Sequence, residues 1–116
     1  VAVNNAKVLV LGFTFKEDCP DLRNIRVIDV VNEFTGLGMN VDVFDPWADL
    51  EQAKSAYNIT LTDQPEKNAY DAIVLTVAHE AFKTLGASEI RKWGKGTHVL
   101  FDTKGALPGH AVDGRL

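Results

Sequence analysis

The sequence has one cysteine, no long apolar run and no excess of positive charge, and each absence excludes a class of protein. A single cysteine among 116 residues cannot form an internal disulfide, which suits a reducing compartment such as the cytoplasm. No apolar stretch approaches the roughly 20 residues that span a bilayer, and no signal-peptide pattern opens the chain. The formal net charge of −4 disfavours nucleic acid and anionic membranes as partners.

Patterns that carry catalysis or bind metals are also scarce. The three histidines show no metal-ligand spacing with one another or with acidic residues. The serines lack the Gly-x-Ser-x-Gly turn of hydrolases. Cys19 has no histidine nearby in the sequence, and a loop cysteine before a proline is more often packed than reactive. We therefore assign neither a catalytic residue nor a metal site to this chain.

The sequence does contain a regular alternation of apolar runs with helical patterns. Buried strands are predicted at residues 7–13, 40–45, 70–77 and 98–102, and a short strand at 59–61. Helices are predicted at residues 25–37 and 48–57, with two short helices around 79–85 and 87–93. A turn is expected at 94–97 and a loose tail at 108–116. This alternation predicts an α/β protein with a three-layer doubly wound (Rossmann-like) fold and a parallel sheet of about five strands.

Residues 1–116 contain no linker, repeat or low-complexity tract, so a single domain is expected. The chain starts at Val1 rather than Met, and its first strand begins almost at once. We expect a fragment of a longer protein.

The loop from Phe15 to Asn24 follows the first strand, and ligands of open parallel sheets bind at the carboxyl ends of strands. Lys16 and Arg23 belong to this loop, and Lys104 follows the last predicted strand at the same edge. Long cations that converge there would bind a diphosphate through charge-assisted hydrogen bonds. The alternative is that each is a solvated or locally paired surface charge, because Glu17, Asp18 and Asp21 are adjacent. The shared edge favours the binding site.

Two other ligand classes fit the sequence less well. A dinucleotide fingerprint needs three glycines after the first strand, and only Gly12 is present, although Asp45 stands where a ribose-binding acid would lie. A phospho-receiver domain would use Thr76 and Lys104. It also needs an acidic pair after the first strand to hold magnesium, and that pair is missing.

The motifs of the chain resemble the C-terminal, UDP-binding domain of the UDP-glucose/GDP-mannose dehydrogenase family, and the resemblance covers nearly the whole chain. The version of the loop at residues 19–24 is most similar to bacterial UDP-N-acetylhexosamine 6-dehydrogenases of the kind that serve Vi-type capsular polysaccharide. The residues that carry the resemblance are 12–16 (GFTFK), 19–24 (CPDLRN), 41–46 (VDVFDP), 76–82 (TVAHEAF) and 102–105 (DTKG).

The resemblance implies an NAD-dependent enzyme that oxidises the C6 alcohol of a UDP-sugar twice, to a uronic acid. It implies that Phe15, Lys16 and Lys104 contact the UDP moiety and that Arg23 reaches toward NAD across a domain interface. NAD and the catalytic cysteine would belong mainly to N-terminal and central domains outside this chain, and the parent would be a homo-oligomer. The isolated domain would then be inactive. The alternative is a stand-alone nucleotide-binding or interaction module without redox activity.

Overall fold

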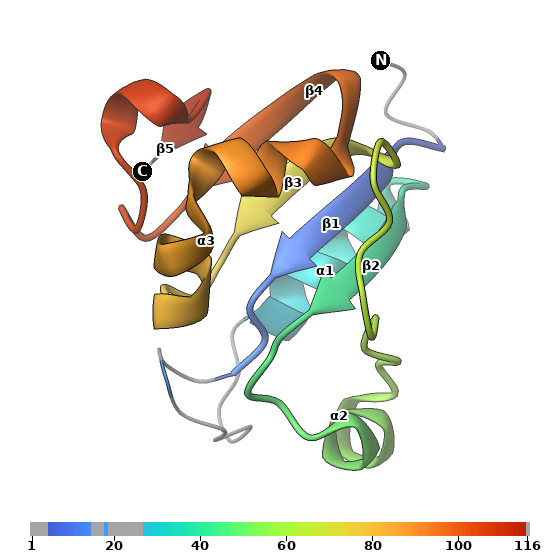
Figure 1. Cartoon of the computed structure of the whole chain (residues 1–116). Helices are drawn as coiled ribbons and strands as arrows, with labels where there is room; N and C mark the ends of the chain where they lie inside the picture. Colours follow the sequence, from blue (N-terminus) through green and yellow to red (C-terminus); the bar gives the residue numbers. More distant parts are fainter. Residues whose placement is uncertain (1–4, 15–17, 19–26, 116) are drawn as a thin grey trace.

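A computed structural model of the chain describes residues 5–14, 18 and 27–115. Within them lies one sheet of parallel strands in the order β2-β1-β3-β4-β5 (Figure 1). The strands are β1 (Lys7–Leu11), β2 (Asn40–Phe44), β3 (Tyr70–Leu75), β4 (Gly94–Asp102) and β5 (Gly114–Arg115). Because β1 lies between β2 and β3, the chain winds outward to β2 and then returns past β1. The predicted doubly wound parallel sheet is confirmed.

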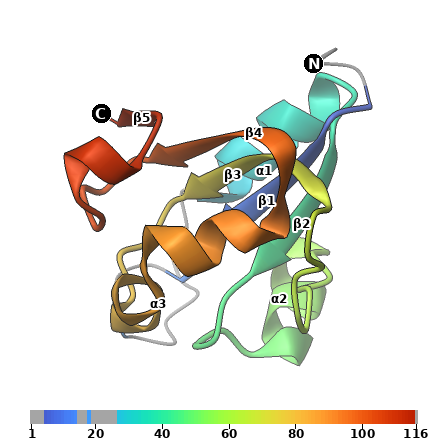
Figure 2. The ribbon, with the colours of Figure 1, turned by 45° about the horizontal axis from the view of Figure 1, so that its top comes forward.

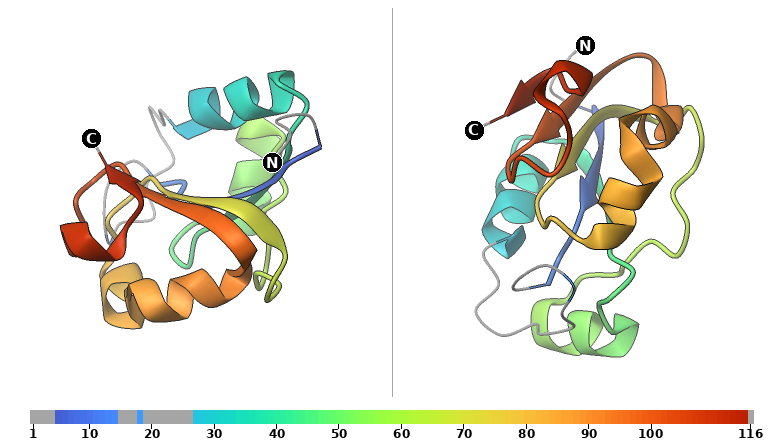
Figure 3. Two further views of the ribbon diagram at one scale, coloured as in Figure 1. Left: turned by 90° about the horizontal axis from the view of Figure 1, so that it is seen from above. Right: turned by 60° about the vertical axis from the view of Figure 1, so that its left-hand side comes forward.

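The two faces of the sheet pack against different helices, as expected for strands that are apolar on both sides. Val8 and Val10 of β1 point to one cluster, with Val27 and Val31 of α1 (Val27–Gly36). Leu9 of β1 points to the other face, where residues of α3 (Glu80–Ile90) and η1 (Arg91–Trp93) pack. The left view of Figure 3 shows α1 and α3 on opposite faces of the sheet, which gives three layers.

The helix α2 (Leu50–Tyr57) lies at the end of the sheet rather than across its face. Figures 1 and 2 both show α2 beyond the end of β2. Asp49 caps its first turn by accepting a hydrogen bond from the Gln52 N–H at 2.9 Å. Tyr57 meets Phe13 edge to face at 5.7 Å between ring centroids, so α2 packs against the residues that follow β1.

Several local predictions are confirmed and others are wrong. The helix at 79–93 is interrupted at Gly86, whose φ of 81° is non-helical, as predicted. The predicted strand at 59–61 forms a single bridge between Val43 and Leu61, because this segment only touches the outer side of β2. Helical spacing predicts Leu50 on the apolar face of the helix at 48–57, but Leu50 is 53% exposed and does not belong to the buried face.

The predicted turn at 94–97 and the predicted loose tail are also wrong. β4 already begins at Gly94, with a register irregularity opposite Tyr70 and Ala72. The tail forms η2 (Gly109–Ala111) and β5. Asp113 holds the tail, since its backbone N–H donates to the Leu100 carbonyl and its carboxylate accepts from the Leu100 N–H, both at 2.8 Å. These pairings involve polar residues, which apolar periodicity does not detect.

Candidate functional site

The carboxyl edge of the sheet, meaning the described residues 12–14, 18, 45–47, 76–79 and 102–104, holds a dense network of polar contacts. Parallel sheets of this type place their ligands at this edge. Its side chains come from the connections after β1, β2, β3 and β4. The network is therefore built by tertiary folding from four separate parts of the chain.

Asp45 is the centre of the network and its side chain is fully buried. One carboxylate oxygen, Oδ2, accepts from the N–H groups of Phe13 at 2.6 Å and Thr14 at 3.1 Å. The other, Oδ1, accepts from the N–H groups of Trp47 at 2.7 Å and Ala48 at 3.2 Å. A residue that ends β2 thus fixes both the chain leaving β1 and the chain entering α2.

The carboxylate form of Asp45 is favoured despite its burial. Burial by itself raises the pKa of Asp45, because an ion loses its water. The hydrogen bond from His79 and the backbone hydrogen bond from Phe13 act against it, and the pKa of Asp45 ends below its ordinary value. Asp45 is therefore an anion whose oxygens are already occupied by donors from the protein.

His79 is the second buried polar residue of the network, and its two ring nitrogens have distinct partners. The backbone N–H of Asp18 donates to His79 Nδ1 at 2.8 Å. Because Nδ1 accepts, the proton lies on Nε2, which is 2.8 Å from Asp45 Oδ2 and donates to it. The hydroxyl of Thr14 lies 3.1 Å from the same Nε2. One imidazole thus connects the residues after β1, β2 and β3.

Asp18 binds the start of α3 through its side chain as well as its backbone. Its φ of 55° is left-handed, and its Oδ1 accepts from the Glu80 N–H at 2.8 Å. That N–H belongs to the first turn of α3, where N–H groups have no partner within the helix. His79, which directly precedes α3, makes no side-chain cap of its own. Asp18 therefore caps α3 from a loop that is distant in sequence.

Threonines and Asp102 tie the remaining strand ends together. The Thr76 hydroxyl lies 2.7 Å from the Gly12 carbonyl, and the Thr103 hydroxyl donates to the Leu75 carbonyl at 2.9 Å. Asp102 is buried and accepts from the N–H groups of Lys104 at 3.0 Å and Leu107 at 2.8 Å. These contacts make the edge rigid, and the bonding of Thr76 to backbone suits a structural role.

Lys104 is the predicted binding residue that the structure describes. Its side chain is exposed and forms no ion pair with any residue in the described part of the chain. It follows β4, which is two strand spacings, or about 10 Å, from β1 at the same edge. Phe15, Lys16, Cys19 and Arg23 lie outside the described residues. The convergence of Lys16 and Lys104 on one diphosphate therefore stays a prediction.

The network of Asp45, His79 and Asp18 is not among the sites predicted from the sequence. A signal for part of it was present, since Asp45 and His79 each follow a buried strand and strand ends meet at this edge. The spacing of the histidines bears on metal binding alone and does not indicate a hydrogen bond from His79 to Asp45. Among the described residues, no group of three or more His, Cys, Asp and Glu side chains is placed to hold a metal ion.

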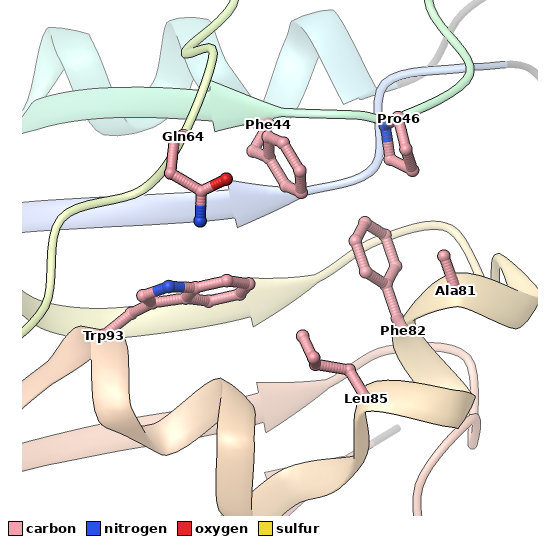
Figure 4. A pocket seen from close by; sticks show the side chains of 7 residues that line it. All are labelled: Phe44, Pro46, Gln64, Ala81, Phe82, Leu85 and Trp93. Carbon is pink, nitrogen blue, oxygen red and sulfur yellow. The ribbon is translucent and has the colours of Figure 1, made fainter.

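An apolar hollow lies along α3, away from Lys104. The hollow has a volume of about 230 Å³ and continues, through shared residues, into a more polar hollow of about 260 Å³. Figure 4 shows the rings of Phe44, Phe82 and Trp93 around the first hollow, with Gln64 above. The stretch between α2 and β3, which supplies Gln64 to the lining, contains no helix. The described chain also contains no helix long and apolar enough to cross a membrane.

The chain is similar in sequence to several known proteins. A sequence profile described as the UDP-glucose/GDP-mannose dehydrogenase family, UDP binding domain, matches residues 9–109. The UDP-N-acetyl-D-glucosamine 6-dehydrogenases of Pseudomonas aeruginosa and Salmonella typhi are 50% and 47% identical to the chain over all of its 116 residues. The chain spans only 28% and 27% of the length of these two relatives.

Solved structures show the same fold at low sequence identity. The UDP-D-ManNAc dehydrogenase of Pyrococcus horikoshii matches 99% of this chain with a TM-score of 0.76. The UDP-N-acetyl-mannosamine dehydrogenase Cap5O of Staphylococcus aureus matches 96% with a TM-score of 0.72. Both are 22% identical to the chain, which covers 26% and 25% of those proteins. The likeness establishes the fold of a part of a larger molecule.

Proposed function

The chain belongs to the UDP-glucose/GDP-mannose dehydrogenase family as its UDP-binding domain, and we propose that residues 1–116 are a single domain that holds the UDP end of a UDP-N-acetylhexosamine. The observation that carries the proposal is the carboxyl edge, where Lys104 is exposed without a described ion-pair partner. Asp45, His79 and Asp102 make this edge rigid, and a rigid site loses little freedom when a ligand binds.

In the proposed site, Lys104 and Lys16 bind the diphosphate and Phe15 lies beside the UDP moiety. Lysine ammonium groups bind phosphate oxygens through charge-assisted hydrogen bonds, which are shorter and stronger than neutral ones. The loop after β1 and the loop after β4 start about 10 Å apart, which two long side chains can bridge. Arg23 is proposed to reach toward the cofactor at the boundary with another domain.

The parent protein is proposed to be a cytoplasmic, homo-oligomeric, NAD-dependent UDP-sugar 6-dehydrogenase that forms a uronic acid for surface polysaccharide. This rests on the names of the relatives, of which the chain is little more than a quarter. NAD does not fit the edge described here. Both Asp45 oxygens are taken by protein donors, so this acid cannot bind a ribose, and only one glycine follows β1. We propose that NAD and the reacting groups belong to other domains and that the isolated domain is inactive.

Calorimetry with UDP, GDP and inorganic phosphate tests the proposal on this chain. We expect weak binding that is selective for UDP, because other domains would supply much of the site. Lys104→Ala and Lys16→Ala should each weaken UDP binding by about tenfold, as expected when a hydrogen bond to a charged group is lost. Lys67→Ala removes the same charge from an exposed residue before β3, at the opposite end of the sheet, and should leave binding unchanged.

Other outcomes of this titration would favour a different function. Equal binding of all three ligands, or no binding, would favour the stand-alone nucleotide-binding or interaction module. If Lys67→Ala weakens UDP binding as much as Lys104→Ala and Lys16→Ala do, the losses of affinity reflect the net charge of the chain. A UDP site at the carboxyl edge would then be excluded.

A further inference from the structure

We propose that His79 is a positioning residue for UDP binding, because it holds the two described residues that flank Phe15 to Glu17. The inference rests on the proposed function, in which Phe15 and Lys16 contact UDP. His79 Nδ1 accepts the N–H of Asp18 at 2.8 Å, and its Nε2 lies 3.1 Å from the Thr14 hydroxyl. Thr14 and Asp18, the described residues on either side of residues 15–17, thus both contact one buried ring.

The ring can act as an anchor because its own orientation is held from several sides. Nε2 donates to Asp45, and Asp45 also accepts the N–H groups of Phe13 and Thr14. The ring centroid lies 5.5 Å from that of Phe82 and 6.4 Å from that of Trp47. A fully buried imidazole with both nitrogens engaged keeps one tautomer and one orientation.

The two described residues on either side of residues 15–17 have fixed surroundings of their own. Thr14 is buried and Asp18 has a left-handed φ of 55°. The Asp18 carboxylate additionally accepts the Glu80 N–H, so Asp18 is held both by His79 and by the first turn of α3. Ordering a loop residue on binding costs conformational entropy, and an anchor present before binding removes part of that cost. His79 should therefore raise UDP affinity without touching UDP.

Two substitutions separate the anchoring of Asp18 from general support of the fold. In His79→Asn, the side-chain oxygen takes the place of Nδ1 and still accepts the Asp18 N–H, whereas the donor to Asp45 and the contact with the Thr14 hydroxyl are lost. Thr14 keeps the hydrogen bond from its N–H to Asp45. In His79→Gln, the side-chain amide takes the place of Nε2 and still donates to Asp45, whereas the acceptor for Asp18 is lost. Both variants lose buried hydrogen bonding and the same ring packing.

UDP affinity is measured by calorimetry, and the free energy of unfolding is measured with urea, on the same set of proteins. We expect His79→Gln to weaken UDP binding by about tenfold, the ratio that corresponds to one lost hydrogen bond, and His79→Asn to stay within about threefold of the unchanged chain. Stability should fall similarly in both. Tyr70→Phe is the matched control, because it deletes the 2.6 Å hydrogen bond from Tyr70 to Asp42 within β3 and β2 and should leave UDP affinity unchanged.

Nuclear magnetic resonance supplies a readout that does not depend on UDP. The ring nitrogens of His79 should show the Nε2–H tautomer, and the Asp18 amide should be protected from exchange in the unchanged chain and in His79→Asn but not in His79→Gln. An equal loss of affinity in both histidine variants, or an unprotected Asp18 amide, overturns the proposal. If the unchanged chain binds no UDP while Asp18 is protected as expected, the proposed function fails and only the structural anchor is supported.

Discussion

Replacing Asp45 by alanine is expected to lower the free energy of unfolding of this chain by about 3–5 kcal/mol, the cost of removing one partner from a buried charged network. Four backbone N–H groups and the His79 ring donate to this carboxylate. Alanine leaves these donors buried without an acceptor. UDP binding is expected to be lost with the geometry of the edge. Urea unfolding followed by circular dichroism measures the change.

Asp45→Asn keeps the shape of the side chain and is nevertheless expected to cost about 2–3 kcal/mol, because an amide replaces one acceptor with a donor that faces N–H groups. Asp49→Ala is the matched control from the same connection. Asp49 is exposed, and within the described part of the chain its carboxylate accepts the Gln52 N–H alone, so its loss should cost about 1 kcal/mol, as for other helix N-caps. If both alanine variants lose the same stability, the Asp45 network is not a major contributor to the fold.

The same carboxylate predicts how stability depends on pH. The pKa of Asp45 is lower in the folded chain than its ordinary value, so the folded state binds fewer protons than the unfolded state near that pH. The stabilisation by Asp45 is therefore complete above its ordinary pKa and is lost as the pH falls through the lowered value. The difference in stability between the unchanged chain and Asp45→Asn should shrink across this acidic range. A difference that stays constant would show that the ionised form of Asp45 is not the stabilising one.

The second large effect is expected at Gly12, the residue that directly follows β1. Its φ of 107° is one that residues with a Cβ rarely adopt, and an added Cβ would lie 2.6 Å from Val77 Cβ and 2.8 Å from the Val77 backbone nitrogen. Neither the backbone nor a Cβ atom can move aside easily. Gly12→Ala is expected to lower the free energy of unfolding by about 3 kcal/mol or more, through backbone strain combined with overpacking.

Two further alanine variants separate these contributions. Gly86 combines a φ of 81° with a ψ of 161°, a region that residues with a Cβ rarely adopt, and nothing lies within 4 Å of an added Cβ, so Gly86→Ala should cost about 1–2 kcal/mol from strain alone. Gly36 ends α1 with no neighbour within 4 Å of an added Cβ and no unusual φ, so its replacement should be neutral or stabilise by up to about 1 kcal/mol. Losses of similar size for Gly12→Ala and Gly86→Ala would exclude the contact with Val77 as the cause.

Local patterns predicted most of the central sheet. Val8, Leu9, Val10 and Leu11 form a continuous apolar run, and only a strand buried on both faces suits such a run. Helix periodicity and the break at Gly86 were predicted for the same reason, because each depends on residues a few positions apart. The errors fall where pairing depends on distant polar groups. β5 exists because Asp113 binds the backbone of Leu100, and nothing in the tail alone indicates this.

The sequence by itself determined the fold class and the place of Lys104 at the carboxyl edge of the sheet. Only the tertiary structure decided what makes that edge rigid. Asp45, His79 and Asp18 are separated by up to 61 residues, and no periodicity relates them. Their roles follow from which donors and acceptors are buried together. Burial makes each unpaired polar group costly, so the folded chain, rather than local preference, selects their partners.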